Sequence, residues 1–235
     1  MNGTWRDEHP IKILETKYLT PNVKRFQTTK PKGYQFIPGE ATDIVINQPE
    51  WLDKRRAFTF TGLNDWSFLE FTIKIHKDHQ GVTNKLDSLK EGDELIIHDS
   101  FGDILYDNAG TFIAGGAGVT PFIANFRQLE RDKRLEGNRL IYSNQTEEDI
   151  ILLGEFERLL GENFINTLTR KPSEDYHFGR INKEYLKEVI SDFSQYFYIC
   201  GSVKMMEEIK EILIDLGAKE EKIVIELDFN TQVLD

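Results

Sequence analysis

A glycine-rich turn that ends in proline is the clearest sign of chemistry in this sequence. The turn follows an apolar run at residues 112–114 and reads Gly116, Ala117, Gly118, Val119, Thr120 and Pro121. Glycine allows a tight turn and a close backbone approach to a ligand, while threonine and then proline suit a helix start. Because N–H groups at a helix start attract phosphate, the stretch predicts a strand, a turn and a phosphate-binding helix. The alternative is a turn that serves only chain geometry.

The turn departs from the GxGxxG pattern of Rossmann dinucleotide-binding folds, because proline replaces the third glycine. Those folds also place an acidic residue at the end of the second strand. Here the corresponding strand, expected at residues 139–143, ends in Ser143, Asn144 and Gln145. A Rossmann dehydrogenase is therefore disfavoured.

A second candidate lies on an expected strand in the first half of the chain. It comprises Arg56, Ala57, Phe58 and Thr59. An arginine that points out of a strand can bind a pyrophosphate, and an aromatic face beside a hydroxyl can bind a ring with hydrogen-bonding edges. The same four residues fit equally well to a barrel strand with a surface charge and a core aromatic residue.

Three further stretches have residue types that suit a nucleotide. They are Gly81, Val82 and Thr83; Thr169, Arg170 and Lys171; and Cys200, Gly201 and Ser202. The first begins a short expected helix, which is either a phosphate site or a plain cap. The second follows a strand, where the cations either grip a phosphate or are simply solvated. The third ends a strand at the edge where open α/β sheets bind ligands, although a lone cysteine there is more often a core residue.

Composition indicates an ordinary globular protein in a reducing compartment. The 235 residues are 39% hydrophobic and 29% charged, which leaves room for two modest domains. A net charge of −11 argues against a nucleic-acid binder. One cysteine excludes an intramolecular disulfide and an iron–sulfur cluster, and the five histidines form no metal set. With no signal-peptide pattern and no apolar stretch of membrane-spanning length, we expect a cytoplasmic protein.

The apolar pattern changes near residue 110. Strands are expected at residues 11–16, 23–28, 41–46, 57–61, 70–76 and 94–98, with a helix at 82–89, and then strands at 111–114, 139–143, 163–169, 197–200 and 222–227 alternating with helices at 120–134, about 155–160, 182–190 and 202–216. The first set predicts an antiparallel β-barrel, and the second predicts a parallel sheet covered on both faces. We therefore expect a β-barrel domain at residues 1–107 and an α/β nucleotide-binding domain at residues 108–235.

Taken in order, these motifs resemble those of the ferredoxin–NADP reductase family, in its single-chain bacterial branch of flavodoxin and ferredoxin reductases. Residues 36–39 resemble its F-x-P-G motif, residues 56–59 its R-x-[YF]-[ST] flavin motif and residues 81–83 its G-x-x-S/T diphosphate turn. Residues 116–121 resemble its G-[TA]-G-x-x-P nucleotide turn, and Cys200 and Gly201 with Met205 resemble its C-G-x-x-x-M motif. The resemblance extends from about residue 9 to residue 229.

The resemblance implies a barrel that binds FAD and an α/β domain that binds NADPH or NADH. Implied flavin contacts are Arg56 at the pyrophosphate, Phe58 against the isoalloxazine, Thr59 near its N5 atom, and Ala57, Ile75, His76, Gly81, Val82 and Thr83. Expected nucleotide contacts are Gly116, Gly118, Thr120, Pro121, Thr169, Arg170, Cys200, Gly201 and Met205. Thr59, Cys200 and Glu226 are the expected catalytic residues, with Cys200 beside the nicotinamide and Glu226 helping to orient it.

We therefore expect an FAD-dependent NAD(P)H oxidoreductase that passes electrons singly to flavodoxin or ferredoxin. Cations at residues 169–171 favour NADPH, because a 2′-phosphate needs cationic partners. An acidic carrier also needs a local basic patch. The residues available for it are Lys54, Arg55, Arg127, Arg131, Lys133 and Arg134. The alternatives are a reductase that uses free flavin as a substrate and an electron-transfer subunit of a larger complex.

Overall fold

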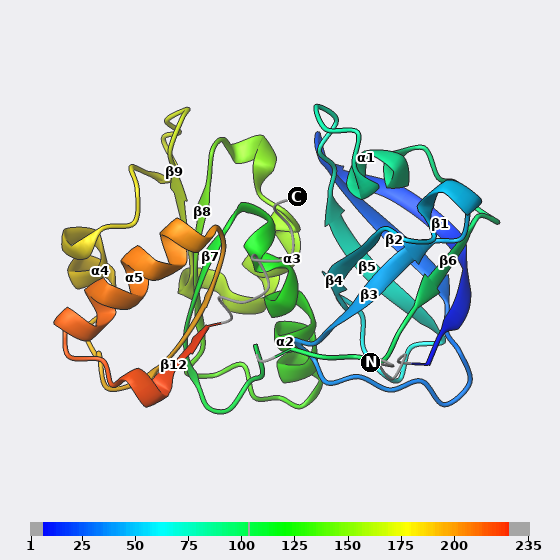
Figure 1. Ribbon diagram of the computed structural model, residues 1–235. Helices are drawn as coiled ribbons and strands as arrows, with labels where there is room; N and C mark the ends of the chain where they lie inside the picture. The colour runs from blue at the N-terminus through cyan, green and yellow to red at the C-terminus, as the bar shows by residue number, and fades with distance from the viewer. Residues whose placement is uncertain (1–6, 103, 226–235) are drawn as a thin grey trace, which may run out of the picture.

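The computed structural model describes residues 7–102 and 104–225, which fold into two halves lying side by side (Figure 1). A six-stranded antiparallel sheet makes up the N-terminal half, and a six-stranded parallel sheet lies in the C-terminal half. Within those described ranges, no helix is both long enough and apolar enough to cross a membrane.

The first sheet closes into a barrel, as the sequence predicts. Its elements are β1 (His9–Thr20), β2 (Val23–Thr29), β3 (Ala41–Ile46), β4 (Arg55–Thr59), β5 (Phe68–Lys74), α1 (Val82–Asp87) and β6 (Glu94–Ile97), with strand order β4-β3-β6-β1-β2-β5. A bridge between Phe60 and Phe71 joins the two edges of that order. The bridge brings the two edge strands together around the aromatic core of Phe26, Phe60 and Phe71.

Strand β5 alternates apolar and polar residues. This alternation predicts that Phe71 and Ile73 face the barrel core and that Thr72 and Lys74 face solvent or a ligand. Phe71 and Ile73 lie in the core, as predicted. Thr72 does not face solvent, because it is only 5% exposed and its hydroxyl lies 3.3 Å from that of Thr61.

The second half alternates strands and helices. Its elements are β7 (Gly110–Gly115), α2 (Thr120–Arg131), β8 (Arg139–Asn144), α3 (Leu153–Leu160), β9 (Phe164–Leu168), β10 (His177–Phe178), α4 (Lys183–Val189), β11 (Tyr196–Cys200), α5 (Val203–Asp215) and β12 (Ile223–Ile225), with strand order β10-β9-β8-β7-β11-β12. The glycine turn forms a short 3₁₀ helix, Gly116–Val119, that runs directly into α2. Val119 therefore takes the N-cap position expected for Thr120.

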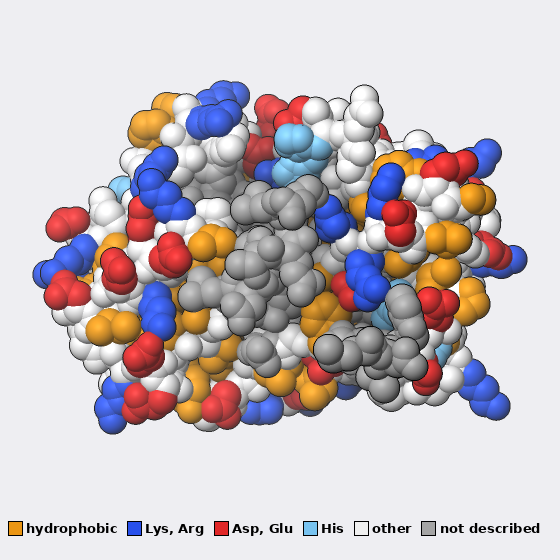
Figure 2. All heavy atoms as spheres, viewed as in Figure 1, with side chains coloured by type: hydrophobic (Ala, Val, Ile, Leu, Met, Phe, Trp, Pro, Cys, Tyr) orange, Lys and Arg blue, Asp and Glu red, His pale blue; other side chains and the backbone are white. Residues whose placement is uncertain are grey.

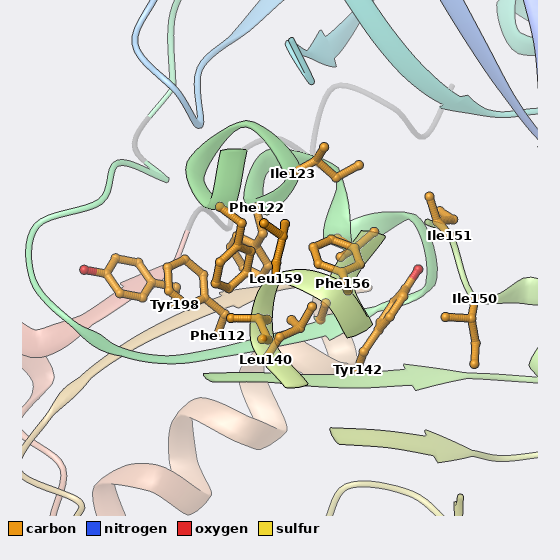
Figure 3. Close-up of a cluster of buried hydrophobic side chains, with 14 of the residues drawn as sticks. Phe112, Phe122, Ile123, Leu140, Tyr142, Ile150, Ile151, Phe156, Leu159 and Tyr198 are labelled. Carbon is orange, nitrogen blue, oxygen red and sulfur yellow. The ribbon is translucent and has the colours of Figure 1, made fainter. Parts of the chain in front are cut away.

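Hydrophobic clusters cover both faces of the parallel sheet, which confirms the predicted layering. Phe112 of β7 points into a cluster with Phe122 of α2 and Tyr142 of β8, and these side chains lie between the strands and helices in Figure 3. The next residue, Ile113, points the other way, into a cluster that includes Leu213 of α5. Each buried apolar side chain contributes about 1.5–3 kcal/mol, so this two-sided packing fixes where the carboxyl ends of the strands lie.

Candidate active site

The glycine turn is held against the end of β11 by a contact that only glycine permits. A Cβ atom on Gly118 would lie 2.3 Å from the carbonyl oxygen of Cys200 and 2.6 Å from the nitrogen of Gly201. Both are main-chain atoms, so they cannot rotate away. The neighbouring Gly116 has a φ of +53°, in the left-handed region that favours glycine. The turn and the Cys200 motif are therefore one packed unit.

Met205 explains the spacing of the cysteine motif. Ser202 caps α5 and accepts a hydrogen bond from the Met205 N–H at 3.4 Å, which places Met205 in the first turn of the helix. The Met205 sulfur lies 2.3 Å from where a Cβ on Gly115 would be and 2.9 Å from where one on Gly201 would be. The methionine thus fills the space that these two glycines leave.

Tyr142 holds the glycine turn in place through a hydrogen bond. Its hydroxyl donates a hydrogen bond of 2.8 Å to the carbonyl oxygen of Gly116, and burial raises the pKa of the phenol, so it stays protonated. The side chain is buried in the cluster of Figure 3. This bond fixes the direction of the Gly116 peptide plane and hence of the N–H groups that follow.

Replacing Tyr142 with phenylalanine should weaken nucleotide binding by about 2- to 10-fold, because the loss of one neutral hydrogen bond costs about 0.5–1.5 kcal/mol. The measurement is the Kd for NADPH and for NADH by titration. Tyr198→Phe is the control, since that buried hydroxyl donates to the Asn108 carbonyl at 2.7 Å, away from the turn. Equal affinities for Tyr142→Phe and the wild type would contradict this role.

A pocket opens at the carboxyl ends of the parallel strands and extends to the barrel. It is lined by Asn22, Val23, Lys74, Gly116, Ala117, Ser143, Asn144, Gln145, Asp149, Ile151, Thr169, Ser202 and Met205. The first three residues belong to the barrel and the others to the α/β half, so the pocket lies between the two halves. This is the edge at which open α/β sheets bind ligands. Of the predicted nucleotide contacts, Gly116, Thr169 and Met205 line it directly.

The side-chain amide of Asn144 faces this pocket with its hydrogen-bonding groups unpaired by the described residues. It ends β8, is only 4% exposed, and neither its side-chain oxygen nor its nitrogen makes a hydrogen bond within the part of the chain that the structure describes. A buried amide without partners costs about 1–3 kcal/mol, so a ligand with donors and acceptors would compensate it. The sequence indicates this position only as a missing acid, whereas the alternation along β5 places Lys74 on the face that meets solvent or a ligand.

The stretch after β9 contributes unequally to the pocket. The Thr169 N–H and hydroxyl both donate to the Asn144 carbonyl, at 2.9 and 3.2 Å, which anchors Thr169 at the pocket wall. The N–H groups of Arg170 and Lys171 donate to the Gln145 carbonyl at 2.9 and 3.2 Å, while both side chains are exposed. Neither cation is among the pocket-lining residues, so the sheet anchors their main chain and leaves the side chains outside.

The predicted flavin stretch lies on β4, whose residues from Arg56 to Thr59 are all half-buried. Phe58 packs against the barrel core from the side. Arg56 donates to the Arg55 carbonyl at 2.8 Å, and among residues 7–102 and 104–225 no carboxylate forms an ion pair with it. Arg55, in contrast, lies 3.7 Å from Asp43. Arg56 can therefore offer its guanidinium to an anion.

The end of β5 and the start of α1 are joined by a hydrogen bond. The His76 N–H donates to the Thr83 hydroxyl at 3.4 Å, and Gly81 caps α1 with nothing within 4 Å of its would-be Cβ. Burial, and then the charge of Lys74, lowers the pKa of His76, so its ring is neutral at pH 7. Ile75 and Val82, predicted flavin contacts, turn their side chains into the barrel core, so only their main chains can face a ligand.

Two of the six cations that we expected in a basic patch for an acidic carrier are paired with carboxylates. Arg127 is largely covered, with a side chain only 12% exposed, and it pairs with Glu70 and Glu155. Arg131 pairs with Asp65 at 2.6 Å. On the face shown in Figure 2, acidic and basic side chains are interspersed over both halves. The local carboxylates thus neutralise the helix α2 cations that the sequence alone presents as a cluster.

Two predictions concern sites of other kinds. Glu226, an expected catalytic residue, lies outside the described residues. For a metal, no group of three or more His, Cys, Asp or Glu side chains in the described ranges is placed to hold an ion. The described site therefore consists of main-chain turns, one orphaned amide and a few cations.

Comparison with known proteins gives one matching domain family and several relatives. Residues 112–211 match the oxidoreductase NAD-binding domain. The chain is 25% identical to the flavohemoprotein of Bacillus subtilis over 96% of its own length and 60% of that protein. It is 26% identical to NADH-cytochrome b5 reductase 2 of Mus musculus, over 77% of this chain and 79% of the mouse protein.

The fold also matches solved structures. The crystal structure of a ferredoxin NADP+ reductase from Neisseria gonorrhoeae with bound FAD and NADP superposes with a TM-score of 0.82 at 22% identity. The match covers 93% of this chain and 98% of that one. The chain spans only about three fifths of the length of the flavohemoproteins it matches, since the aligned part covers 60–61% of them.

Proposed function

We propose that this chain passes electrons from NADPH or NADH through FAD to a separate one-electron acceptor. The premise is that the chain belongs to the ferredoxin–NADP reductase family by its fold and its NAD-binding domain. The observation that carries the proposal is the pocket between the two halves. Its α/β side holds Gly116 and Asn144, and its barrel side holds Lys74. A donor bound on one half would thereby face an acceptor bound on the other.

The barrel residues fit the flavin. Arg56 would bind the pyrophosphate, the start of α1 at Gly81–Thr83 would bind part of the same group, and Phe58 with Thr59 would line the ring. When bound, FAD would supply the ability to accept two electrons together and to release them one at a time. The role of the chain is to hold the ring at the pocket and to exclude water from it.

The α/β residues fit the pyridine nucleotide. The 3₁₀ turn Gly116–Val119 would present its N–H groups to the diphosphate, and Asn144 would bond a polar group of the adenosine half. Gly118 holds the end of β11 in place, so Cys200 would stand beside the nicotinamide and position it by contact. Lys74 reaches the same pocket from the barrel and adds a positive charge toward a phosphate.

The deciding experiment is a visible spectrum of the purified protein followed by anaerobic titration with NADPH and NADH in parallel. We expect a flavin band that bleaches with at least one donor. A colourless protein that shows saturation kinetics with added flavin would favour the flavin reductase that uses flavin as a substrate. Bound FAD that neither donor bleaches would point to a subunit without turnover of its own.

A preference for NADPH would depend on Arg170, whose exposed side chain follows β9 beside the pocket wall. Replacing Arg170 with alanine should raise the KM for NADPH about tenfold, because a charge-assisted hydrogen bond to a 2′-phosphate contributes about 1.5–3 kcal/mol. The KM for NADH should change less than about twofold, since NADH lacks that phosphate. Arg180→Ala, another exposed arginine outside the pocket, is the control. Equal effects on both donors would overturn the assignment.

The acceptor is a finer proposal. Flavodoxin or ferredoxin would fit the reaction, and the names of the relatives, a flavohemoprotein and a cytochrome b5 reductase, support a haem protein equally well. The pairing of Arg127 and Arg131 with carboxylates counts against docking of an acidic carrier on α2. Reduction rates of flavodoxin, ferredoxin and a cytochrome at two ionic strengths would separate them, because docking through complementary charges weakens as salt rises.

A further inference from the structure

A largely covered arginine joins three parts of the molecule at the boundary between the two halves. Arg127 of α2 donates from Nη1 to the Thr61 carbonyl at 2.8 Å and to Glu70 of β5 at 2.6 Å. Its Nε and Nη2 donate to the two oxygens of Glu155 of α3, at 2.6 and 2.8 Å. Two of these partners belong to the barrel and one to the α/β half. The guanidinium is thus the common centre of contacts from both halves.

The partners of Arg127 are themselves held in place. Glu70 has a side chain only 3% exposed and accepts further hydrogen bonds from Thr61 at 3.1 Å and Gln27 at 3.1 Å. Trp66 lies beneath the guanidinium, at 5.2 Å from its ring centre. Burial alone would lower the pKa of Arg127, but the hydrogen bonds and charges of Glu155 and Glu70 raise it. The arginine therefore stays charged, and the cluster is satisfied only when both halves are docked.

Helix α2 is held at a second point along the same boundary. Asn125 donates from Nδ2 to the Ile104 carbonyl at 3.4 Å and to the Pro121 carbonyl at 3.2 Å. A Cβ on Gly39 of the barrel would lie only 2.0 Å from that Ile104 carbonyl oxygen, so the barrel packs tightly here. Asn125 and Arg127 lie on the helix that begins at the glycine turn, with Arg127 about two turns from its start.

We propose that Arg127 is a positioning residue: through Glu70, Thr61 and Glu155 it fixes the docking angle of helix α2 on the barrel, and so sets the separation between the glycine turn and the flavin strand β4. This inference rests on the proposed function for its catalytic consequence. Its structural part, the docking angle, stands independently of any cofactor.

The test compares Arg127→Gln, Arg127→Lys and the wild type as full-length, FAD-loaded protein. The rate constant for bleaching of the flavin band at saturating nucleotide should fall about 10- to 100-fold in Arg127→Gln, because a misplacement of about 1 Å can cost a hundredfold. The Kd for nucleotide should change less than about threefold, since Arg127 does not line the nucleotide pocket. Small-angle scattering should show a larger radius of gyration. Arg127→Lys keeps the charge and should lie between the two.

Arg158→Gln is the matched control. Arg158 of α3 pairs with Glu130 of α2. The substitution therefore removes an arginine–glutamate pair between the same two helices without affecting a contact to the barrel. A scattering profile of Arg127→Gln equal to that of the wild type, or a loss confined to Kd, would overturn the proposal. If the wild type itself fails to bleach, the proposed function fails, and the scattering comparison still decides whether Arg127 sets the docking. If Arg127→Gln does not fold, Arg127→Lys carries the same comparison.

Discussion

Alanine at position 118 should abolish reduction by nucleotide while leaving flavin in the protein. The added Cβ would lie 2.3 Å from the Cys200 carbonyl oxygen and 2.5 Å from its carbonyl carbon, which are main-chain atoms of a central strand. The turn and the strand must therefore separate. Overpacking of this kind costs about 1–3 kcal/mol, and here the displacement falls on the residues that would face the nicotinamide. We expect the rate of flavin bleaching by NADPH or NADH to fall at least about a hundredfold.

The readout for Gly118→Ala is single-turnover bleaching together with the FAD content of the purified protein. Gly154→Ala is the control, because that glycine lies in α3 with nothing within 4 Å of its would-be Cβ and no left-handed φ. Alanine there should be neutral or stabilise the helix by about 0.5–1 kcal/mol. Wild-type bleaching rates in Gly118→Ala would show that the close approach of turn and strand is unimportant.

Much of the fold could be predicted because period-two and helical apolar patterns are local. Strand β3 (Ala41–Ile46) has the bounds that its sequence predicts, and the two strands predicted before it, β1 and β2, pair as a hairpin with Thr20 opposite Val23. Strand β10 (His177–Phe178) was not predictable, because two exposed residues carry no alternation. Helix α2 ends at Arg131, three residues before the predicted end at residue 134. The apolar pattern continues past Lys133, but a left-handed φ of 58° at Lys133 ends the helix.

The site residues, too, could be predicted only where the signal in the sequence is local. The glycine turn and the cysteine motif could be located because their glycines meet a local steric need that the sequence expresses as spacing. Asn144 could not be located, and Lys74 could be placed only on an outward face, since the pocket that both residues line forms only when the two halves pack together. For Arg127, the sequence predicts an exposed position that long-range packing then covers. Its sequence neighbours indicate a surface patch, whereas Glu70, 57 positions away, makes it a buried contact.

Replacing Arg56 with glutamine should release the flavin. Arg56 is the cation of β4 for which the described residues supply no carboxylate partner, and it borders the half-buried stretch that would line the ring. A charge-assisted hydrogen bond contributes about 1.5–3 kcal/mol and a guanidinium can make two to a pyrophosphate, so the Kd for FAD should rise by at least about a hundredfold. The measurement is the absorbance ratio at the flavin and protein bands, followed by FAD titration of the apoprotein.

The neighbouring arginine makes this experiment specific. Arg55→Gln removes the same charge from the same strand, but Arg55 lies 3.7 Å from Asp43 and is half-exposed, so its loss should leave FAD affinity within about twofold, as is usual for exposed pairs. If both variants lost flavin equally, the effect would come from the general charge of β4 and not from a contact at Arg56. Retention of flavin by Arg56→Gln, with wild-type Kd, would move the pyrophosphate site away from β4 altogether.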